Sequence, residues 1–473
     1  MCDTLDQLIF SGLDSRDAAR PAITQAETGQ TISYGGLSRR VLQARDHLRC
    51  HLSDPESRSV IAVQLPNSVD FAVFFFGALA AGAAVTPISM HATAAETAHQ
   101  IAATGAEVLV TTAGVARTGA APVLADWPAG LGVIPFSSGT TGSPKPVALT
   151  HANLVANVRQ MSAALDRNRM TKDWPIAAPL PFAHVYGLTV LLCTSLYRRN
   201  HLIAFARFDP RTFLPLHQKY QVAWSYVAPA ILARIVRERL ADGLDLTALK
   251  VVLSGADTLT APLQQAAAAE LGCEVVQGYG LSEASPVTHV NIRGYDDPAT
   301  LGTPVDGTEV RVVDGELWVR GPQVMAGYLG LPAETAAAKD AQGWLRTGDV
   351  VELGPDGRGL RVIGRAKEII NHNGFQVSPT EVEERLREHP GISDAAVAAW
   401  QRSAGGEAPR AVVVPAAEGA VPSAHELASW VAARLAAYKV PVRFDVADAV
   451  PRTATGKVAR MALRARWAET PAD

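Results

Sequence analysis

The sequence predicts an α/β fold: a large N-terminal domain of layered α/β subdomains plus a β-rich subdomain, followed by a small α+β C-terminal domain. Short apolar strands alternate with helices over the first 100 residues and again between 251 and 280. This alternation favours layered sheets with mostly parallel strands. At roughly 150 residues per domain, the 473 residues correspond to about three folding units.

Composition and charge exclude several classes of protein. Hydrophobic residues make up 48% of the chain and charged residues 19%, as in a folded globular protein. The 46 acidic and 43 basic residues give a net charge of −3, which favours neither nucleic acid nor an anionic membrane as partner. The N-terminus lacks the basic region of a signal peptide. The scattered cysteines form no C-x-x-C pair and suit a reducing compartment, so we expect a cytoplasmic protein: Cys2, Cys50, Cys193 and Cys273.

The elements of the first part follow from apolar runs and turn residues. Residues 59–66 predict a buried strand, 70–83 a helix and 84–88 another strand. The apolar run 71–85, about 15 residues, is too short to cross a bilayer comfortably. We therefore expect a buried core helix and no membrane span.

Further along, strands and helices continue to alternate before the pattern changes. Residues 251–255 predict a strand, 262–271 a helix and 274–280 a strand that runs into a loop. From Thr308 two strand-like runs flank Asp314-Gly315, a dipeptide typical of tight hairpins. A β-rich subdomain is therefore expected here.

The segment after Lys367 has the size of a compact α+β lid domain. It begins with a hairpin around Asn373-Gly374 and an amphipathic helix over 379–389. A strand at 394–400, a Gly/Ala-rich loop at 404–409 and a strand at 411–415 follow.

The most informative stretch is 133–152, in which an apolar run leads into glycines and hydroxyl residues. Glycines allow tight turns, and free N–H groups and hydroxyls can surround phosphate oxygens. The spacing is not that of a P-loop. From the residues alone, a phosphate-binding loop and an ordinary polar loop are equally favoured. The loop consists of Ser137, Ser138, Gly139, Thr140, Thr141 and Gly142, followed by Lys145.

The run SSGTTGSPK resembles the phosphate loop of the adenylate-forming superfamily, which includes acyl-CoA synthetases, 4-coumarate–CoA-ligase-like enzymes, luciferases and peptide-synthetase adenylation domains. Further motifs occur in the order found in that family. They are PLPFAHVYGL at 179–188, QGYGLSEASP at 277–286, LRTGD at 345–349, GRAKEIINHNGFQVSPTEVE at 364–383 and PRTATGK at 451–457.

The resemblance implies an ATP site in the large domain. Tyr279 would lie against adenine, with Ala256 on the other side of the ring and Gln277 and Gly278 along the same groove. Ser282 stands where relatives usually have threonine and keeps the hydroxyl for the α-phosphate. Glu283 matches the family's Mg²⁺ ligand, and a hard carboxylate suits that ion.

The remaining catalytic positions are implied in the same way. Asp349 and Arg365 match the residues that contact the ribose, and Lys457 matches the mobile lysine that acts in adenylation, where a compact cation suits the developing charge. Lys367 matches the hinge between an N-terminal domain at 1–366 and a mobile C-terminal domain at 367–473. Gly374 matches the glycine past which pantetheine reaches the acyl group.

The acid is constrained but not identified. Amino-acid-activating domains carry an aspartate early in this motif, and the chain has PFAHVYGL there instead. Val185 stands where dihydroxybenzoate enzymes tend to have asparagine. His184 matches a gate beside the acyl carboxylate. An aryl and a medium acyl acid both remain open, because an apolar pocket separates chain lengths weakly. The resemblance places the pocket at Tyr186, Val190, Pro286 and Val287.

We expect an AMP-forming acid–thiol ligase that uses ATP and Mg²⁺ to form an acyl-AMP and then a thioester with CoA. Arg207 matches a basic position that contacts CoA phosphate in coumarate-type ligases. An alternative acceptor is the phosphopantetheine of a carrier protein. Less favoured alternatives are a luciferase-like oxygenase and a non-catalytic nucleotide-binding relative. Pro146, where the family commonly has glycine, and an apparently shortened segment between 105 and 133 depart from the family pattern.

Overall fold

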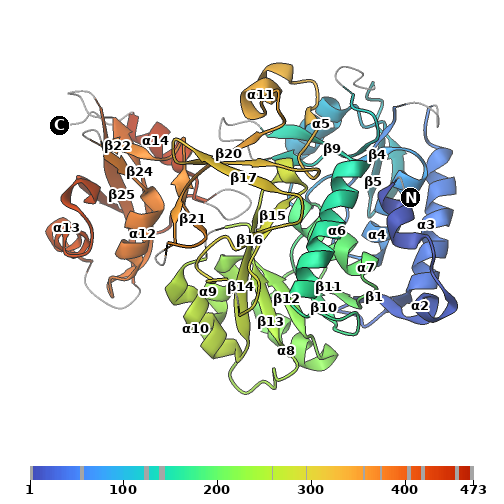
Figure 1. Cartoon of the computed structure of the whole chain (residues 1–473), viewed down its shortest axis with the longest axis horizontal. Coiled ribbons are helices and arrows are strands. Elements are labelled where there is room, and N and C mark those ends of the chain that lie inside the picture. The colour runs from blue at the N-terminus through green and yellow to red at the C-terminus, as the bar shows by residue number, and fades with distance from the viewer. Residues whose placement is uncertain are drawn as a thin grey trace. The chain divides into compact units, whose positions relative to one another are not determined.

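The computed structural model of the protein describes residues 4–53, 58–121, 127–137, 144–257, 259–294, 296–354, 357–372, 375–401, 406–416, 421–452 and 458–468 (Figure 1). The chain divides into two compact units. The first comprises residues 1–311, 318–347 and 354–360, and the second comprises 312–317, 348–353 and 361–473. Each unit is described by itself below.

The first unit contains a large mixed sheet whose centre is parallel. Strands β12, β13 and β14 run parallel in register, with Val227 beside Ser254 and Ser254 beside Gln277. The carboxyl ends of these strands therefore lie at one edge of the sheet. In spatial order the sheet consists of β16 (Thr303–Pro304), β15 (Val287–Val290), β14 (Glu274–Gly280), β13 (Val251–Ser254), β12 (Trp224–Val227), β10 (Ile176–Ala178), β11 (Leu202–Ala204), β1 (Pro21–Gln25) and β2 (Thr31–Ser33).

A second sheet of this unit holds the strands that flank the predicted phosphate loop. Strand β9 pairs antiparallel with β19, β7 and the short β8. The sheet order is β19 (Gly327–Tyr328), β9 (Lys145–Thr150), β7 (Leu131–Val133), β4 (Ala84–Pro87), β3 (Val60–Val63), β5 (Val108–Thr111) and β6 (Gly114–Arg117), with β8 (Phe136–Ser137) paired to β9.

Helices cover these sheets through apolar side chains. Phe213 of α8, Leu232 of α9 and Leu271 of α10 join one buried cluster with Val252 and Val275 of the large sheet, and α9 and α10 lie beside β13 and β14 in Figure 1. The helices of the first unit are α1 (Leu5–Phe10), α2 (Ser15–Ala19), α3 (Tyr34–Arg49), α4 (Val69–Ala80), α5 (Ala94–Thr104), α6 (His151–Arg167), the π-helix η1 (Tyr186–Thr194), α7 (Ser195–Tyr197), α8 (Pro210–Tyr220), α9 (Pro229–Glu238), α10 (Ala261–Leu271), η2 (Ser282–Ala284) and α11 (Pro332–Ala338).

The predicted β-rich region forms a further sheet, whose residues are divided between the two units. Its first two strands are joined at Asp314-Gly315, where φ is +50° and +80°. Positive φ at both turn residues is the geometry that this dipeptide favours, so the predicted hairpin is confirmed. The strands are β17 (Glu309–Val313), β18 (Glu316–Arg320), β20 (Leu345–Leu353) and β21 (Leu360–Arg365).

The second unit is an α+β body around β24. Alternate residues of this strand face two clusters: Val397 packs with Val382 of α12 and Val431 of α13, whereas Trp400 packs with Trp467 of α14. Burial on both faces explains the unbroken apolar run at 395–400. The elements are β22 (Ile370–His372), β23 (Phe375–Val377), α12 (Pro379–Arg387), β24 (Ile392–Gln401), β25 (Glu407–Pro415), α13 (Ala424–Ala432), η3 (Ala437–Lys439), β26 (Arg443–Val446) and α14 (Arg460–Ala468).

Most predicted elements are found near their expected bounds. Helix α4 is a buried core helix, with Phe71, Phe75 and Phe76 fully buried, and no helix in the described residues is long and apolar enough to cross a membrane. The predicted loop at 404–409 is shorter than expected, because β25 already begins at Glu407 to pair with Gln401. Residues 373–374 of the predicted hairpin lie outside the described residues, although β22 and β23 pair antiparallel on either side of them.

We predict that Glu384→Gln stabilises the protein at alkaline pH. Burial raises the pKa of Glu384 to about 7, against the opposing charges of Arg385 and Arg387. The folded chain thus keeps a proton that the unfolded chain loses near its ordinary pKa, so this group's stabilisation is full below that pKa and is lost as pH rises through about 7. Glutamine mimics the protonated form. The melting temperature of the variant should be about 2–4 °C higher than that of the parent protein at about pH 8. At about pH 4 the two melting temperatures should agree within error.

Thermal unfolding at both pH values measures this shift. Glu388→Gln is the matched control, because Glu388 lies at the end of the same helix in a surface ion pair with Arg385. A lower melting temperature of Glu384→Gln at the alkaline pH would contradict the prediction.

Candidate active site

Strand pairing brings three residues together at one end of the second sheet. Ser137 of β8 lies beside Lys145 of β9, and Tyr328 of β19 pairs with Val147 on the other edge of β9. The N–H of Leu329 donates to the carbonyl of Pro146 at 2.9 Å. Pro146, which stands where the family commonly has glycine, thus lies in a strand that is paired on both sides.

Tyr328 links a cation to a carboxylate. Its hydroxyl donates to Oε1 of Glu283 at 2.8 Å, and Nζ of Lys145 lies 5.0 Å from the centre of its ring. The carbonyl of Glu283 accepts from the N–H of Met325 at 2.8 Å. Oγ of Ser137 is buried and has no hydrogen-bond partner among the described residues. This cluster of Ser137, Lys145, Glu283 and Tyr328 therefore joins one unpaired hydroxyl, one ammonium and one carboxylate.

The predicted phosphate loop itself lies largely outside the described residues. Ser138, Gly139, Thr140, Thr141 and Gly142 all fall in the undescribed segment 138–143. Their predicted roles stay predictions, and the cluster of Ser137, Lys145, Glu283 and Tyr328 describes only the surroundings of that loop.

The predicted adenine residues lie at the ends of β13 and β14. Ala256 follows β13 in the left-handed region, with φ of +72°. The ring of Tyr279 in β14 lies edge-on to His289, with centroids 5.8 Å apart. Burial lowers the pKa of His289 to about 4, so this neighbour of Tyr279 is neutral at physiological pH. Gly278 and Tyr279 are partly exposed, as a binding edge requires.

Gln277 is placed differently from its neighbours. Its side chain is buried, and Nε2 donates to the carbonyls of Pro298 and Thr300 at 2.8 and 2.7 Å. The amide nitrogen is thus used to hold the loop at 297–302. Ser282 is partly exposed at the start of η2, directly before Glu283.

Tyr186 forms the centre of the predicted acyl pocket. Its hydroxyl donates to the carbonyl of Leu253 at 3.3 Å, and its ring carbons would lie only 3.1 Å from a Cβ at Gly255. Glycine at 255 is therefore what allows the ring to lie against β13. Nδ1 of the exposed His184 accepts from the N–H of Tyr186 at 3.2 Å, and Val190 is buried further along η1.

The other predicted pocket residues are held by α6. Asn157 donates to the carbonyl of Val287 at 2.8 Å and accepts from its N–H at 3.1 Å. Ser285 fixes the preceding turn, since its hydroxyl donates to the carbonyl of Gln323 at 2.8 Å. Pro286 and Val287 are buried beside these polar contacts.

Two aromatic residues beside Tyr186 were missed by the sequence analysis. The ring of Tyr226 is 6.2 Å from that of Tyr186 and 6.0 Å from that of Trp224. Tyr226 and Trp224 are fully buried, and neither the hydroxyl nor the indole N–H makes a hydrogen bond of ordinary geometry to a described residue, although the indole N–H lies near enough to the hydroxyl to oppose the rise in the pKa of Tyr226. Burial raises the pKa of Tyr226, which keeps it a neutral phenol. No local motif marks these residues, because only the pairing of β12 with β13 brings them to Tyr186.

Arg207 follows β11, and its side chain is exposed. Among the described residues, none makes a hydrogen bond or ion pair with that side chain. The backbone N–H of the preceding Ala206 donates to Glu27 at 2.8 Å. The structure therefore leaves the predicted contact with CoA phosphate as a prediction.

In the second unit, Asp349 of β20 and Arg365 of β21 form an ion pair at 2.9 Å. Only 5% of the Asp349 side chain is exposed. Lys367 is exposed, and its carbonyl accepts from Nη1 of Arg464 at 3.4 Å. Gly374 and Lys457 lie outside the described residues.

The donor set near Glu283 fits a magnesium ion that is bound mainly by other ligands. Among the described residues, no three His, Cys, Asp or Glu side chains gather into a cluster that could hold a metal. Mg²⁺ commonly takes one or two carboxylates and completes its shell with phosphates and water. A single partly buried carboxylate beside a phosphate loop is consistent with that mode.

Comparison with known proteins gives consistent matches along the chain. The model of the AMP-binding enzyme family matches residues 14–131 and 121–329, and that of the AMP-binding enzyme C-terminal domain matches 381–457. 4-Coumarate–CoA ligase 5 of Oryza sativa subsp. japonica is 33% identical, covering 98% of this chain and 94% of its own. 4-Coumarate–CoA ligase 1 of Petroselinum crispum is 32% identical, covering 96% and 92%.

Solved structures agree on the fold. The crystal structure of ATP-bound MatB from Rhodopseudomonas palustris is 25% identical, with a TM-score of 0.88 and coverage of 99% of both chains. The anthranilate CoA ligase AuaEII in complex with anthranoyl-AMP is 20% identical, with a TM-score of 0.84 and coverage of 98% and 97%. At that identity the second match speaks for the fold alone.

We predict that Tyr328→Phe weakens binding of MgATP about tenfold, which corresponds to about 1.4 kcal/mol for a lost hydrogen bond to a charged group. The change removes the donor to Glu283 and keeps the ring beside Lys145. Calorimetric titration with MgATP measures the effect. Tyr220→Phe is the matched control, because Tyr220 also donates through its hydroxyl, to the carbonyl of Ala26 at 3.3 Å. Equal affinity of Tyr328→Phe and the parent protein would refute the prediction.

Proposed function

The chain belongs to the AMP-binding enzyme family of adenylate-forming ligases, and from this premise we propose that it activates an aryl or medium-length acyl carboxylate and transfers the acyl group to CoA. Its class, an AMP-forming acid–thiol ligase that uses ATP, follows from the family. The relatives are named for an aryl acid and CoA together. This pairing supports the proposed substrates.

In the first half-reaction a carboxylate oxygen of the acid attacks the α-phosphorus of ATP. A new O–P bond forms between the carboxylate oxygen and the α-phosphorus as the bond from that phosphorus to pyrophosphate breaks. The products are acyl-AMP and pyrophosphate. No protein group needs to form a covalent bond. The protein's contribution is to align the reactants and to stabilise the charge that develops between them.

The observation that carries this proposal is the cluster of Ser137, Lys145, Glu283 and Tyr328. Its ammonium and its unpaired hydroxyl flank the predicted phosphate loop and would bind phosphate oxygens there. Glu283, oriented by Tyr328, would hold Mg²⁺, which when bound supplies positive charge to the phosphates. The loop residues 138–142 and Ser282 would add further hydroxyl and N–H donors.

We assign the remaining roles by the same reasoning. Tyr279, Ala256 and Gly278 would line the adenine edge, with Gln277 holding the neighbouring loop from behind. Asp349, oriented by Arg365, would accept hydrogen bonds from the ribose hydroxyls. Lys457 would neutralise charge between carboxylate and phosphate during adenylation.

The two aromatic residues near Tyr186, Tyr226 and Trp224, favour a short aryl acid as substrate over an acid with an extended alkyl chain. Tyr226 and Trp224 fill space behind Tyr186 with rigid rings. The buried hydroxyl of Tyr226 has only the imperfectly aligned indole N–H of Trp224 nearby, so a further hydrogen-bond partner would stabilise it. We therefore propose that a polar ring substituent of the acid hydrogen-bonds to Tyr226, while His184 lies beside the carboxylate and Val190, Pro286 and Val287 contact the apolar part.

In the second half-reaction the thiolate of CoA attacks the acyl carbon. The bond from that carbon to the AMP oxygen breaks, so a thioester and AMP are formed. Arg207, exposed and without a described ion-pair partner, would meet a CoA phosphate. Lys367 would serve as hinge between the two half-reactions, and Gly374 would leave room for pantetheine.

We predict carboxylate-dependent exchange of pyrophosphate into ATP with aryl acids. A panel of benzoic, cinnamic, fatty and amino acids is assayed, with Lys457→Ala as control. Exchange should be highest with an aryl acid and should fall by at least about 100-fold in the control, because one charged group stabilising the transition state contributes roughly that much. Absence of exchange with every acid would refute adenylation of these classes.

The acceptor is tested with the acid that gives the strongest exchange. CoA and a phosphopantetheinylated carrier protein are offered separately, and thioester formation is followed by mass spectrometry. Faster transfer to CoA is expected. Transfer to the carrier protein alone would overturn the assignment of CoA.

We predict that Tyr226→Phe raises KM for a ring-hydroxylated aryl acid about tenfold and leaves KM for its unsubstituted analogue unchanged. The reason is that the change removes the hydroxyl that would bind the ring substituent, an effect of about 1.4 kcal/mol, whereas the loss of its interaction with Trp224 affects both acids equally. Steady-state kinetics on both acids measures the difference. An equal effect on both acids would show that the hydroxyl does not contact the substituent.

A further inference from the structure

Described residues on both sides of the segment 453–457 are held together. The backbones of Arg452 and Val458 form an isolated antiparallel bridge, and the N–H of Ala459 donates to the carbonyl of Pro451 at 2.8 Å. Helix α14 begins directly afterwards, at Arg460. The segment that carries Lys457 thus starts and ends at neighbouring points of the second unit.

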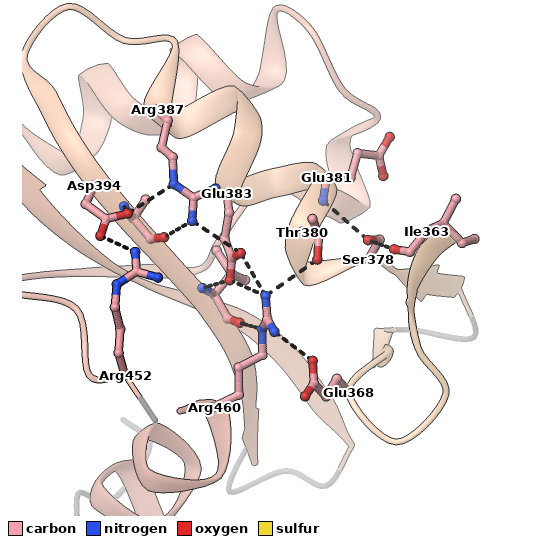
Figure 2. Close-up of polar contacts among 12 residues, drawn as sticks. Ile363, Glu368, Ser378, Thr380, Glu381, Glu383, Arg387, Asp394, Arg452 and Arg460 are labelled. Carbon is pink, nitrogen blue, oxygen red and sulfur yellow. Dashed lines mark hydrogen bonds and ion pairs between the residues drawn. The ribbon is translucent and has the colours of Figure 1, made fainter. Parts of the chain in front are cut away.

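Arg460 anchors the carboxyl-terminal side of this segment (Figure 2). Its Nη2 lies 2.9 and 2.8 Å from the two carboxylate oxygens of Glu383, and its Nη1 lies 2.7 Å from Glu368. Its Nε donates to the carbonyl of Val397 at 3.2 Å. Only 2% of the Glu383 side chain is exposed, so the guanidinium is held by a buried carboxylate of α12, by β24 and by the turn that carries Glu368.

Arg452 anchors the amino-terminal side. Its Nη2 lies 2.6 Å from Oδ2 of Asp394. Arg387 connects this pair to the other one, since its Nε lies 3.1 Å from Asp394 and its Nη2 lies 3.5 Å from Glu383. Figure 2 shows the resulting row of alternating charges. We call it the charge row; its members are Arg452, Asp394, Arg387, Glu383, Arg460 and Glu368.

The charge row ends beside the predicted hinge. Glu368 directly follows Lys367, and the carbonyl of Lys367 accepts from Arg464, one turn along α14 from Arg460. Helix α14 therefore contacts the hinge position and the charge row at once. Any rotation at Lys367 would carry both ends of 453–457 with it.

We propose that Arg452 and Arg460 are positioning residues for adenylation: through the charge row they fix both ends of the segment that carries Lys457 to α12, β24 and the hinge. The proposal rests on the proposed function, because it gives Lys457 its role in the first half-reaction. Both arginines act through the backbone that they hold, so they are positioning and not catalytic residues.

The physical basis is that a flexible lysine is effective only when its backbone is held. A lysine side chain has several rotatable bonds, and further freedom in the flanking chain would spread its ammonium over many positions. A displacement of about 1 Å at a reacting group can cost roughly 100-fold in rate. An arginine that binds one carboxylate through two contacts and another through a third restricts both distance and direction.

The test compares Arg460→Lys with Glu381→Gln. Lysine keeps the charge but cannot make the forked contacts with Glu383 and Glu368. Glu381→Gln is the matched control, because it breaks another ion pair of α12, the one with Lys439 at 2.6 Å, outside the charge row. Asp394→Asn probes the Arg452 side independently.

Three quantities are measured: the rate of pyrophosphate exchange, the rate of thioester formation, and amide hydrogen exchange of the protein without substrate. We expect kcat of pyrophosphate exchange to fall between about tenfold and 100-fold in Arg460→Lys and Asp394→Asn, with KM for ATP unchanged. Thioester formation from the supplied synthetic acyl-AMP of the same acid should stay within about twofold. Amide hydrogen exchange should accelerate in peptides covering 448–462 and not in those covering β24 and β25. The control should behave like the parent protein in all three.

Several outcomes would overturn the proposal. Equal losses of rate in both half-reactions, together with lower thermal stability, would show a merely structural role. An unchanged rate of pyrophosphate exchange in Arg460→Lys and Asp394→Asn would show that the arginines have no role in adenylation. If the parent protein adenylates no acid, the proposed function fails, and hydrogen exchange alone then decides whether the ends are held. Unprotected amides at 458–462 in the parent protein would refute the charge row as an anchor.

Discussion

The parallel register of β12, β13 and β14 is the constraint on which the first unit depends. Val227, Ser254 and Gln277 lie side by side at the carboxyl ends of these strands, so whatever follows each strand must gather at one edge of the sheet. Ala256 follows β13 and Glu283 follows β14 in this way, and Gly278 and Tyr279 form the last part of β14. Ligand sites of open α/β sheets commonly form at such an edge. The residues proposed to bind the nucleotide in the first unit thus come from strand ends and the short segments that follow them.

The second unit depends on charge as well as on apolar packing. Glu383 is buried, and burial raises its pKa although Arg460 and Arg387 oppose the shift. Removing one partner of such a pair commonly costs about 3–5 kcal/mol, because the other charge is left buried. The pairs therefore specify a single arrangement of α12, β24 and α14 around the two sides of 453–457. The apolar cluster of Trp400 and Trp467 packs on the other face of β24.

Much of the fold could be predicted locally, whereas contacts between distant segments could not. The strand at 251–254, the helix ending at Leu271 and the turn at Asp314-Gly315 each have a local signal, either an apolar run or a turn dipeptide. Tyr328 and Arg460 have none: their partners Glu283 and Glu383 are found only once strands pair and helices pack. Motif resemblance named Glu283 and Lys145 but not the phenol between them. The π-helical form of η1 also has no signal in YGLTVLLCT, whose apolar residues suit an ordinary helix equally well.

That π-helix bears on how such a protein can change over evolutionary time. Tyr186 and Val190 sit on a coil that is one residue wider per turn than an α-helix, and the hydroxyl of Thr194 donates back five residues to Thr189 at 2.9 Å. Loss of one residue from this stretch could be absorbed by a partial return to α-helical winding, which would shift the side chains within the stretch while the residues beyond it keep their register. A single codon deletion could thus change the side chains around Tyr186 while the sheet and its loops stayed in place. If Tyr186 contacts the acid as proposed, new acid preferences could arise by a change of length as well as by substitution.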